Sequence, residues 1–380
     1  MHIAWLGKKS PFCGNVTYNR KITNALLERG YEVSFLHFAQ EESHSENWPE
    51  CPEVFLPFLY KSQAFTIPSP RSSKVLMRSL QELKPDLVHV SLTLSPLDFR
   101  LPEICQELNL PLIATFHSPF DSKLRTLKSS TQFLGYQLYA PFLAHYDGVI
   151  VFSRIQRDLL IRLGVPSEKL AVIPNGVEAE KYTPGHSHFK SHLQTQRLFV
   201  YQGRMATEKN VEALLRAWKH CSMGEDSKLV LVGNGPLSPS LRSVDDEQQG
   251  IIWLGAIADE MRRVEILRAA DAFILPSLVE GLSLSLLEAM SCGVACLATD
   301  AGADGEVLED GAGVVLSTQR VTAQLKALLP LFRDHPELTT SLGQKGRQRV
   351  LERYTLSRNI TQIEKLYTEV MNRKQIQLSV

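Results

Sequence analysis

Apolar segments alternate with amphipathic helical patterns along the first half of the chain. Residues 2–6 (HIAWL) and 32–38 (EVSFLHF) are apolar with little alternation, and a helical pattern over 20–29 separates them. Strands of this kind are typical of a parallel sheet that helices cover on both faces. The same pattern predicts strands at 86–90, 110–116 and 148–152 and a helix at 153–164.

The alternation stops at LAVIPNGVEAEKYTPGHSHF, where Pro174, Asn175, Gly176 and Pro184 interrupt regular structure. We therefore expect a domain boundary near residues 174–195. The alternation then restarts, with strands predicted at 197–203, 228–233, 251–255, 272–276 and 294–299 and helices at 211–218 and 260–270.

The predicted fold class is α/β, with two Rossmann-like domains that each contain a parallel sheet. The first domain is expected at 1–182, a linker at 183–196 and the second domain at 197–350. A helical tail, 351–380, is expected to pack back on the first domain. Two such domains facing each other leave a cleft bordered by the carboxyl ends of both sheets, where open α/β folds bind ligands.

The segment VEGLSLSLLEAMSCGVACLAT, 279–299, admits two structural interpretations. Alternating leucine and serine favours a strand, but the later leucine, alanine and methionine residues favour a helix. With Ser283 as the N-cap and Gly293 near the C-terminal cap, Glu280 precedes the helix and Glu288 lies on its second turn. We predict the helix.

A carboxylate among leucines is costly to desolvate unless donors reach it, and sugar or ribose hydroxyls are suitable donors. The N-terminus of the same helix offers backbone N–H groups to an anion such as a diphosphate. This segment could therefore bind both ends of a nucleotide sugar. The alternative is that Glu280 and Glu288 merely flank a surface helix.

Further polar residues follow predicted strands. Arg204 and Lys209 in GRMATEK could bind a diphosphate, although such a pair is also common on solvated surfaces. The glycine-rich turn at Gly233 and Asn234 allows a nucleoside to approach the backbone. In the first domain, Gly14 ends a loop after the first strand. His117 ends a later strand, where it could bind a ligand or have a purely structural role.

Composition excludes several classes of function. The chain has 380 residues, with 41 basic and 41 acidic side chains, so its balanced charge gives no indication of nucleic-acid binding. No apolar run approaches the ~18 residues of a membrane span, and MHIAWLGKK is too short for a signal peptide, so we expect a cytosolic protein. The six cysteines form no C-x-x-C pair and are expected to be reduced. His186, His188 and His192 have spacing that could bind zinc, but their surroundings are typical of a polar linker.

Taken together, these motifs resemble the retaining glycosyltransferases of the GT-B fold, specifically family four with its E-x7-E motif. The segments that carry the resemblance are VFSRIQRDLLIRLGVPSEKLAVIPNGVEAEKY, GRMATEK, LVGNGPL and EGLSLSLLEAMSCG. The resemblance extends over nearly the whole chain and is strongest between Val151 and Leu316. It implies a hexosyltransferase that uses a nucleotide sugar as donor substrate and needs no cofactor.

The resemblance also implies a role for each site residue. Glu288 would hold the ribose, while Arg204 and Lys209 would neutralise the departing diphosphate. Gly14 would bring its loop against the phosphates, and His117 would bind the donor sugar. Glu280 would also hold the donor sugar, together with the backbone of the four residues that follow it: Gly281, Leu282, Ser283 and Leu284.

The reaction must stabilise negative charge on the diphosphate and positive charge on the anomeric carbon. Two cations and a helix N-terminus can meet the first need, and the chain has no Asp-x-Asp pair for a metal, so we predict metal independence. No residue stands out as an enzyme nucleophile. We therefore favour attack by the acceptor on the face from which the diphosphate leaves.

The acceptor is expected to bind the first domain. Two segments, 56–84 and 119–143, mix aromatic and aliphatic residues with basic ones, which suits an anionic membrane surface as well as it suits ordinary helix packing. The basic residues concerned are Lys61, Arg71, Lys74, Arg78, Lys84, Lys123, Arg125 and Lys128. The N-terminal sequences GKKSPFCGNVTYNRKITNALLERG and FHSPFD also resemble glycolipid synthases of the digalactosyldiacylglycerol type. This resemblance implies galactosyl transfer from UDP-galactose to a galactolipid such as monogalactosyldiacylglycerol by a peripheral membrane enzyme.

Other acceptors remain open, including other lipids, polysaccharides and small molecules. A nucleotide-sugar epimerase of the same architecture and a non-catalytic partner that keeps the fold are further alternatives. A dinucleotide oxidoreductase is disfavoured because the G-x-G-x-x-G order is missing.

Overall fold

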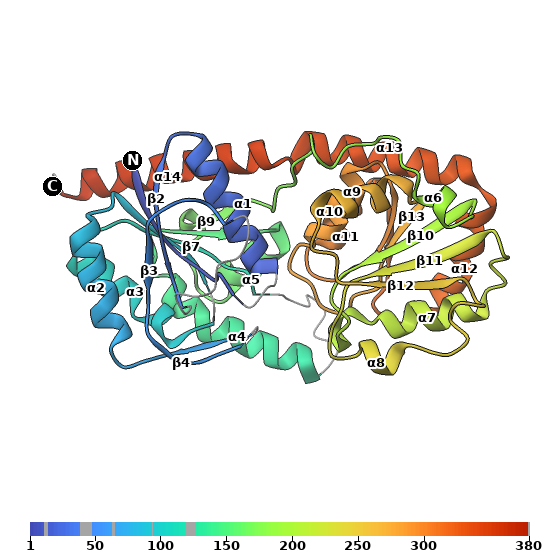
Figure 1. Cartoon of the computed structure of the whole chain (residues 1–380). Coiled ribbons are helices and arrows are strands. Elements are labelled where there is room, and N and C mark those ends of the chain that lie inside the picture. Colours follow the sequence, from blue (N-terminus) through green and yellow to red (C-terminus); the bar gives the residue numbers. More distant parts are fainter. Residues whose placement is uncertain (11–13, 39–47, 63–64, 93, 119–126, 379–380) are drawn as a thin grey trace. The chain divides into compact units, whose positions relative to one another are not determined.

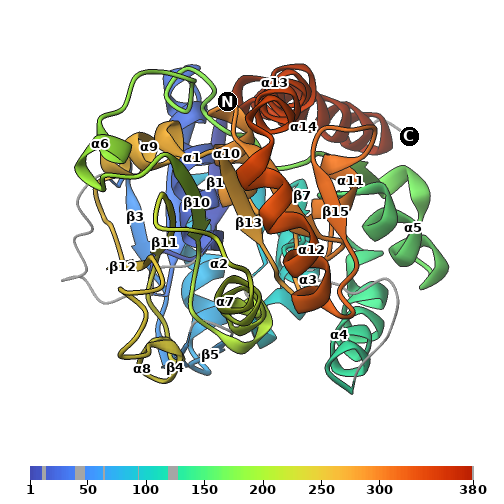
Figure 2. The same cartoon turned by 90° about the vertical axis from the view of Figure 1, so that its right-hand side faces the viewer.

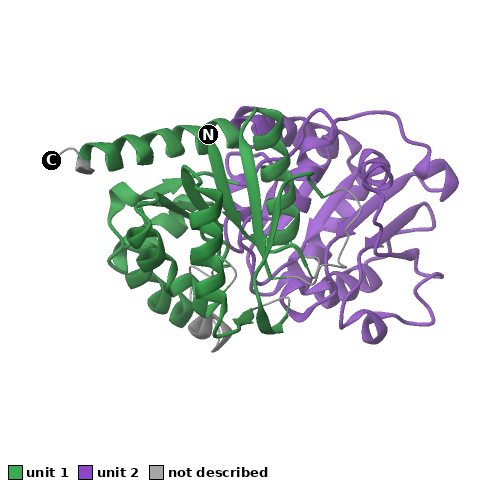
Figure 3. Cartoon of the chain, turned by 60° about the vertical axis from the view of Figure 1, so that its left-hand side comes forward, with its two compact units in different colours: residues 1–118, 126–174, 359–380 green, residues 119–125, 175–358 purple. Residues whose placement is uncertain are grey.

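The computed structural model describes residues 1–10, 14–38, 48–62, 65–92, 94–118 and 127–378. These residues divide into two compact units (Figure 3). Unit 1 contains residues 1–118, 127–174 and 359–378 of the described chain, and unit 2 contains residues 175–358. Each unit has its own parallel sheet (Figure 1).

The sheet of unit 1 has the order β3-β2-β1-β6-β7-β8-β9, and every neighbouring pair is parallel. Its central strands are buried on both faces, which explains why their sequences are continuously apolar. The predicted strands of this half are confirmed, whereas the three-residue strands β3 and β9 had not been predicted. The strands are β1 (His2–Leu6), β2 (Glu32–His37), β3 (Glu53–Phe55), β6 (Leu87–Ser91), β7 (Leu112–Thr115), β8 (Gly148–Val151) and β9 (Leu170–Val172).

Helices and one hairpin complete the N-terminal part of unit 1. The helix predicted at 153–164 begins at Arg154 and has Ser153 as its N-cap, whose hydroxyl accepts a hydrogen bond of 3.1 Å from the N–H of Gln156. The antiparallel hairpin consists of β4 (Phe58–Lys61) and β5 (Thr66–Pro68). The helices are α1 (Gly14–Glu28), α2 (Ser72–Leu83), α3 (Leu101–Glu107), α4 (Leu127–Leu143) and α5 (Arg154–Arg162).

The C-terminal helix α14 (Leu356–Leu378) contributes its residues from 359 onward to unit 1. The Tyr367 hydroxyl lies 2.5 Å from Nδ1 of His89, a fully buried side chain of β6. On the helix surface, Glu364 forms an ion pair of 2.5 Å with Arg29. Lys374 donates a hydrogen bond of 2.6 Å to the carbonyl of Leu110. The part of α14 between residues 360 and 370 therefore contributes to the core of unit 1.

The sheet of unit 2 is also entirely parallel, with the order β12-β11-β10-β13-β14-β15. Its predicted strands are confirmed, and β15 is an additional short edge strand. The strands are β10 (Arg197–Gln202), β11 (Ser227–Val232), β12 (Ile251–Gly255), β13 (Ala272–Leu275), β14 (Ala295–Thr299) and β15 (Val314–Leu316).

Helices surround the sheet of unit 2. Figure 2 shows α7 beside α12, which agrees with the numerous contacts between them. Residues 183–196, which were expected to be a linker, lie in unit 2 and contain α6, whose Phe189 is buried. The helices are α6 (Phe189–His192), α7 (Val211–His220), α8 (Ser238–Leu241), α9 (Glu260–Ala269), α10 (Leu284–Ser291), α11 (Asp304–Leu308), α12 (Val321–Asp334) and α13 (Pro336–Arg353).

Two helical glycines allow the close packing of α13 to be tested. A Cβ added at Gly343 would lie 2.0 Å from the carbonyl oxygen of Gly293, whereas one added at Gly135 on α4 would meet nothing within 4 Å. We expect Gly343→Ala to lower the free energy of unfolding by about 1–3 kcal/mol through overpacking. Gly135→Ala should raise it by about 0.5–1 kcal/mol because alanine favours the helix. Urea unfolding of both variants measures the two effects, and shifts of the same sign would contradict the packing argument.

Candidate functional site

The segment 279–299 forms the predicted helix, so the strand interpretation of its leucine and serine alternation is wrong. Ser283 is the N-cap of α10, and its hydroxyl accepts a hydrogen bond of 3.3 Å from the N–H of Leu286. Gly293 follows the end of the helix with φ of +76°, a conformation that suits glycine. Glu280 therefore precedes the helix and Glu288 lies within it, as predicted.

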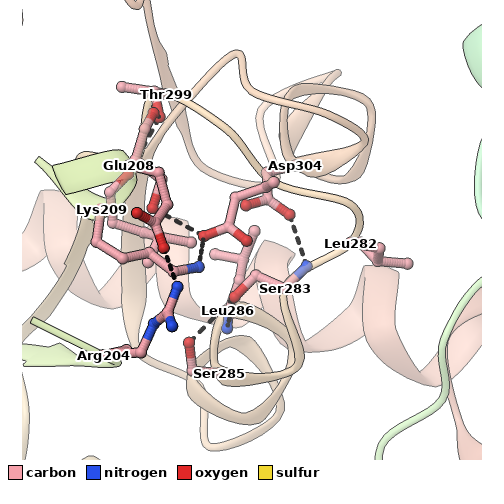
Figure 4. A network of polar contacts seen from close by, with 12 residues as sticks. Arg204, Glu208, Lys209, Leu282, Ser283, Ser285, Leu286, Thr299 and Asp304 are labelled. Atoms are coloured by element: carbon pink, nitrogen blue, oxygen red, sulfur yellow. Dashed lines mark hydrogen bonds and ion pairs between the residues drawn. The ribbon is translucent and has the colours of Figure 1, made fainter. Parts of the chain in front are cut away.

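Lys209 and Glu280 form an ion pair in which Nζ lies 2.5 Å from Oε1 (Figure 4). The Ser277 hydroxyl donates a second hydrogen bond, of 2.8 Å, to the same carboxylate oxygen. The Glu280 side chain is only 9% exposed and that of Lys209 is 20% exposed. Two donors thus compensate for the desolvation of this carboxylate.

Backbone contacts hold the same two loops together. The N–H of Leu278 donates a hydrogen bond of 2.7 Å to the carbonyl of Glu208. The Asn210 amide donates one of 3.1 Å to the carbonyl of Pro276. Since β10 and β13 are neighbours in the sheet, these bonds fix the loops that follow their carboxyl ends.

Arg204 lies in the loop directly after β10, and its guanidinium forms an ion pair with Glu208 (Figure 4). The Tyr201 hydroxyl donates a hydrogen bond of 2.9 Å to the carbonyl of Arg204, which fixes the backbone of this loop. Glu208 had not been predicted, although the sequence places it four residues after Arg204 and next to Lys209. Each predicted cation therefore has a carboxylate partner.

Glu288 is buried and accepts a hydrogen bond of 3.0 Å from the side-chain amide of Gln202, the last residue of β10. The amide oxygen of Gln202 is buried and has no hydrogen-bond partner among the described residues. Glu280 contacts the loop after β10 through Lys209. Both carboxylates of the E-x7-E motif are thus bonded to the carboxyl end of β10 or to the loop after it.

Asp304, the first residue of α11, is a further carboxyl group of the site that the sequence analysis missed. Its Oδ1 accepts a hydrogen bond of 2.9 Å from the N–H of Ser283, and its Oδ2 is buried without a partner among the described residues (Figure 4). Burial raises the pKa of Asp304 well above its usual range, and the negative charge of Glu280 raises it further. The N–H of Ser283, the N-cap residue of α10, is therefore already bonded within unit 2.

The remaining residues predicted for unit 2 lie in loops after strands. Gly233 has φ of +133°, and a Cβ there would lie 1.9 Å from the carbonyl oxygen of Gly203, so neighbouring backbone alone requires the glycine. Asn234 uses its side-chain oxygen to accept a hydrogen bond of 2.8 Å from the N–H of Gly235.

The residues after Glu280 are held by unit 2 through their carbonyls. The carbonyl of Gly281 accepts a hydrogen bond of 2.7 Å from the N–H of Ala303. That of Leu282 accepts one of 2.9 Å from the Asn175 amide. Leu284 is the first residue of α10.

Gly14 and His117 belong to unit 1, where Gly14 begins α1 with open space around its Cα. Nε2 of His117 lies 2.7 Å from the Ser91 hydroxyl, which donates its own proton to Oδ1 of Asn15. The imidazole must therefore carry its proton on Nε2. Burial lowers the pKa of His117 to about 3, so the ring is uncharged at neutral pH.

The described residues contain no cluster that could bind a metal, no disulfide and no helix that could span a membrane. Their His, Cys, Asp and Glu side chains nowhere gather in groups of three or more that could hold a metal ion. Of the cysteines described, Cys51, Cys105, Cys221, Cys292 and Cys296 are all free thiols. None of the described helices combines the length and apolar character required to cross a membrane.

Comparison with known proteins identifies the class. Residues 13–181 match the family described as Glycosyltransferase Family 4, and residues 196–334 match the family described as Glycosyl transferases group 1. The chain is a glycosyltransferase. The two matches cover most of both units, including α10 and the loop that carries Arg204 and Lys209.

The names of two curated relatives refer to a glycolipid and to a lipid-linked sugar. Alpha-monoglucosyldiacylglycerol synthase of Streptococcus pneumoniae is 27% identical over 303 residues, which cover 75% of this chain and 67% of the relative. The UDP-Gal:alpha-D-GlcNAc-diphosphoundecaprenol alpha-1,3-galactosyltransferase of Escherichia coli is 27% identical over 243 residues, covering 60% of this chain and 61% of the relative. The chain thus spans about two thirds of the length of these relatives. The predicted resemblance to digalactosyldiacylglycerol synthase is not shown by these comparisons.

Among solved structures, Anabaena HepE in complex with UDP-glucose has a TM-score of 0.75 to this chain at 18% identity. The likeness covers 97% of this chain and 100% of that one. Together with the two parallel sheets and the helical C-terminus, it confirms the predicted GT-B type of fold.

Asp304→Asn tests whether the buried carboxyl is protonated. An asparagine keeps an oxygen for the Ser283 N–H but has no proton to lose. Because the pKa of Asp304 is raised on folding, its contribution to wild-type stability is complete below about pH 4, the unfolded value, and decreases as pH rises through the folded value. We therefore expect the free energy of unfolding of the variant, relative to wild type, to increase with pH above about 4. Urea unfolding across this range measures the difference, and a constant difference would show that Asp304 titrates normally.

Proposed function

We propose that this glycosyltransferase transfers a hexosyl group from a nucleotide sugar to a lipid-linked or glycan acceptor, with retention of anomeric configuration and without a metal. The observation that carries the proposal is the Lys209–Glu280 pair beside Arg204 at the carboxyl end of β10. This position in an open parallel sheet is where ligands bind. The named donors and acceptors of the relatives support the same substrate classes.

In the proposed reaction, Lys209 and Arg204 bind the diphosphate of the donor and stabilise the charge that develops on it. Without donor both cations are paired with carboxylates, so the diphosphate must compete with Glu280 and Glu208 for them. The Arg204–Glu208 pair is the easier of the two to separate because the Arg204 side chain is 44% exposed and such pairs contribute little to stability. Glu288, which already accepts a hydrogen bond from Gln202, would take the ribose hydroxyls.

The chemical step exchanges one bond at the anomeric carbon for another. The bond between that carbon and the diphosphate oxygen breaks, and the oxygen of an acceptor hydroxyl forms a bond on the same face. The acceptor proton passes to the departing phosphate oxygen. Glu280 stabilises the positive charge that develops on the sugar while its other contacts hold it in place.

Arg204→Ala and Lys209→Ala test the cation assignment. Each variant should lower kcat by about 10² or more, the scale for losing one charged stabilising contact. Turnover is measured with labelled nucleotide sugars and a total lipid extract, with UDP-galactose and monogalactosyldiacylglycerol as the first pair. Arg216→Ala is the matched control because Arg216 forms the same kind of ion pair with Glu212. The Arg216 side chain is 62% exposed. Near-normal rates in both site variants would refute the assignment, and an isomerised donor would identify an epimerase instead.

A membrane surface is the proposed location of the acceptor. On α4, Leu134 and Leu138 are 64% and 55% exposed, and their spacing of four places them on one helix face. On the hairpin, Leu59 and Tyr60 are 69% and 52% exposed. Lys123 and Arg125 lie outside the described residues, as does the side chain of Lys128. Exposed apolar groups on unit 1 support peripheral docking of the kind that the sequence predicted.

Flotation with vesicles tests this docking. We expect wild type to bind vesicles that contain phosphatidylglycerol, and Leu134→Glu with Leu138→Glu to weaken binding at least tenfold, because each buried leucine contributes about 1.5 kcal/mol or more. Leu331→Glu on unit 2, at a leucine that is 46% exposed, is the matched control. Unchanged flotation of the double variant, or no binding of wild type at low salt, would exclude α4 as the docking surface.

A further inference from the structure

Three polar residues of unit 1 lie where an open parallel sheet usually binds its ligands. The strand order proceeds from β1 to β3 in one direction and from β6 to β9 in the other, so β1 and β6 are the strands at which the order reverses. Ligands of such sheets bind beyond the carboxyl ends of these two strands. Ser91 is the last residue of β6, His117 follows the neighbouring β7 by two positions, and Asn15 is the second residue of α1, which follows β1.

A chain of hydrogen bonds leads from the core of unit 1 to these residues and can run in one direction only. The indole N–H of Trp5 donates at 3.2 Å to the side-chain oxygen of Asn19, and an indole nitrogen cannot accept. The amide nitrogen of Asn19 therefore points the other way, where it donates at 3.0 Å to the Lys8 carbonyl and at 3.0 Å to the side-chain oxygen of Asn15. The orientation of Asn15 is fixed a second time, because its amide nitrogen donates to the Leu92 carbonyl at 3.3 Å.

The direction of this chain determines which nitrogen of His117 carries the proton. Because the side-chain oxygen of Asn15 can only accept, the Ser91 hydroxyl must donate its proton to it, at 2.9 Å. The same hydroxyl can then only accept from Nε2 of His117, which lies 2.7 Å away. Nε2 is therefore protonated, and Nδ1 presents a lone pair.

The lone pair on Nδ1 of His117 is accessible to a ligand. This nitrogen has no hydrogen-bond partner among the described residues, and it is not one of the unpaired atoms that the protein buries. The rings of Tyr18 and Phe152 contact the imidazole edge to face, with 4.7 Å and 5.2 Å between ring centres, and so restrict its rotation. An uncharged ring held in this way can bind a hydroxyl group but not a carboxylate, which has no proton to donate.

We propose that Ser91 and Asn15 are positioning residues that fix the polarity of His117, so that its Nδ1 accepts a hydrogen bond from a hydroxyl group of the transferred hexose. This contact selects a neutral sugar group, because a carboxylate in the same place would face the lone pair. That the hydroxyl belongs to a donor hexose rests on the proposed function, whereas the protonation of Nε2 does not.

Proton–nitrogen correlation spectra of the whole protein with isotope-labelled histidine test the polarity. The His117 signals are assigned by their absence from His117→Gln. Wild type should have a protonated Nε2 and an unprotonated Nδ1, and Ser91→Ala should speed exchange of the Nε2 proton with water because its acceptor has gone. A wild-type His117 that is protonated on Nδ1 would overturn the proposal.

Ser34→Ala is the matched control for both measurements. Ser34 is a buried serine of β2 in the same sheet, and its hydroxyl lies 2.9 Å from Nε2 of another histidine, His2. Its removal should change the signals of His2 and leave those of His117 unchanged.

Calorimetric titration identifies the sugar hydroxyl. The probes are UDP, UDP-glucose, UDP-galactose and analogues of both sugars in which a single hydroxyl is replaced by fluorine, which cannot donate. Replacement at one position should weaken wild-type binding about fivefold or more, the scale for leaving one acceptor unpaired. In Ser91→Ala the same replacement should cost less while the affinity for UDP stays unchanged, whereas a purely structural defect would weaken binding of UDP as well.

The outcomes separate this proposal from the proposed function. Binding of the UDP-sugars without a sensitive hydroxyl, or equal losses in wild type and Ser91→Ala, would overturn the positioning role and leave the transferase function standing. A lack of heat with UDP and with every UDP-sugar would overturn the proposed function and the hexose contact with it, while the spectra would still decide the polarity. If Ser91→Ala does not fold, the wild-type spectra and the wild-type fluorine profile decide.

Discussion

The arrangement of the candidate site depends on the ion pair between Lys209 and Glu280. Glu280 is nearly buried, and a carboxylate in that position is stable only if donors replace the water it has lost. Lys209, in the loop after β10, and Ser277, in the loop after β13, supply these hydrogen-bond donors. The contacts to Glu280 therefore fix the two loops relative to each other. Because Arg204 lies in the loop after β10 and α10 follows the loop after β13, the same contacts also position Arg204 and α10.

The same pairing means that both cations of the site already have a carboxylate partner without a ligand. Arg204 with Glu208 and Lys209 with Glu280 place two positive charges against two negative ones. In the proposed reaction, a diphosphate gains from the site only to the extent that it replaces these contacts with stronger ones. We expect this pairing to favour release of the diphosphate, because each carboxylate can take back its cation.

Local sequence patterns were sufficient to predict much of this arrangement. The helix at α10 was predictable because Ser283, the leucines after it and Gly293 all supply helix signals, and Arg204 and Lys209 were predictable because they follow a strongly apolar strand. Asp304 was not predictable because it bonds Ser283 from 21 residues away, and Ser277 was not predictable because its bond to Glu280 depends on the conformation of an irregular loop. The short strands β3, β9 and β15 contain three residues each and are too short to show a period.

Residues 359–378 belong to the first unit although 184 residues of the second unit, 175–358, separate them from the rest of it. A Cβ at Gly148 would lie 3.3 Å from Val370 and 3.5 Å from Leu366, so α14 lies directly on β8. During synthesis on the ribosome, the sheet of the first unit emerges before residues 359–378, so its face at β8 and His89 stays uncovered until those residues have been made. The described residues of the second unit, 175–358, are continuous in sequence and have no such delay. The order of folding is therefore expected to run against the order of synthesis, with the first sheet exposed to chaperones and to aggregation for longest.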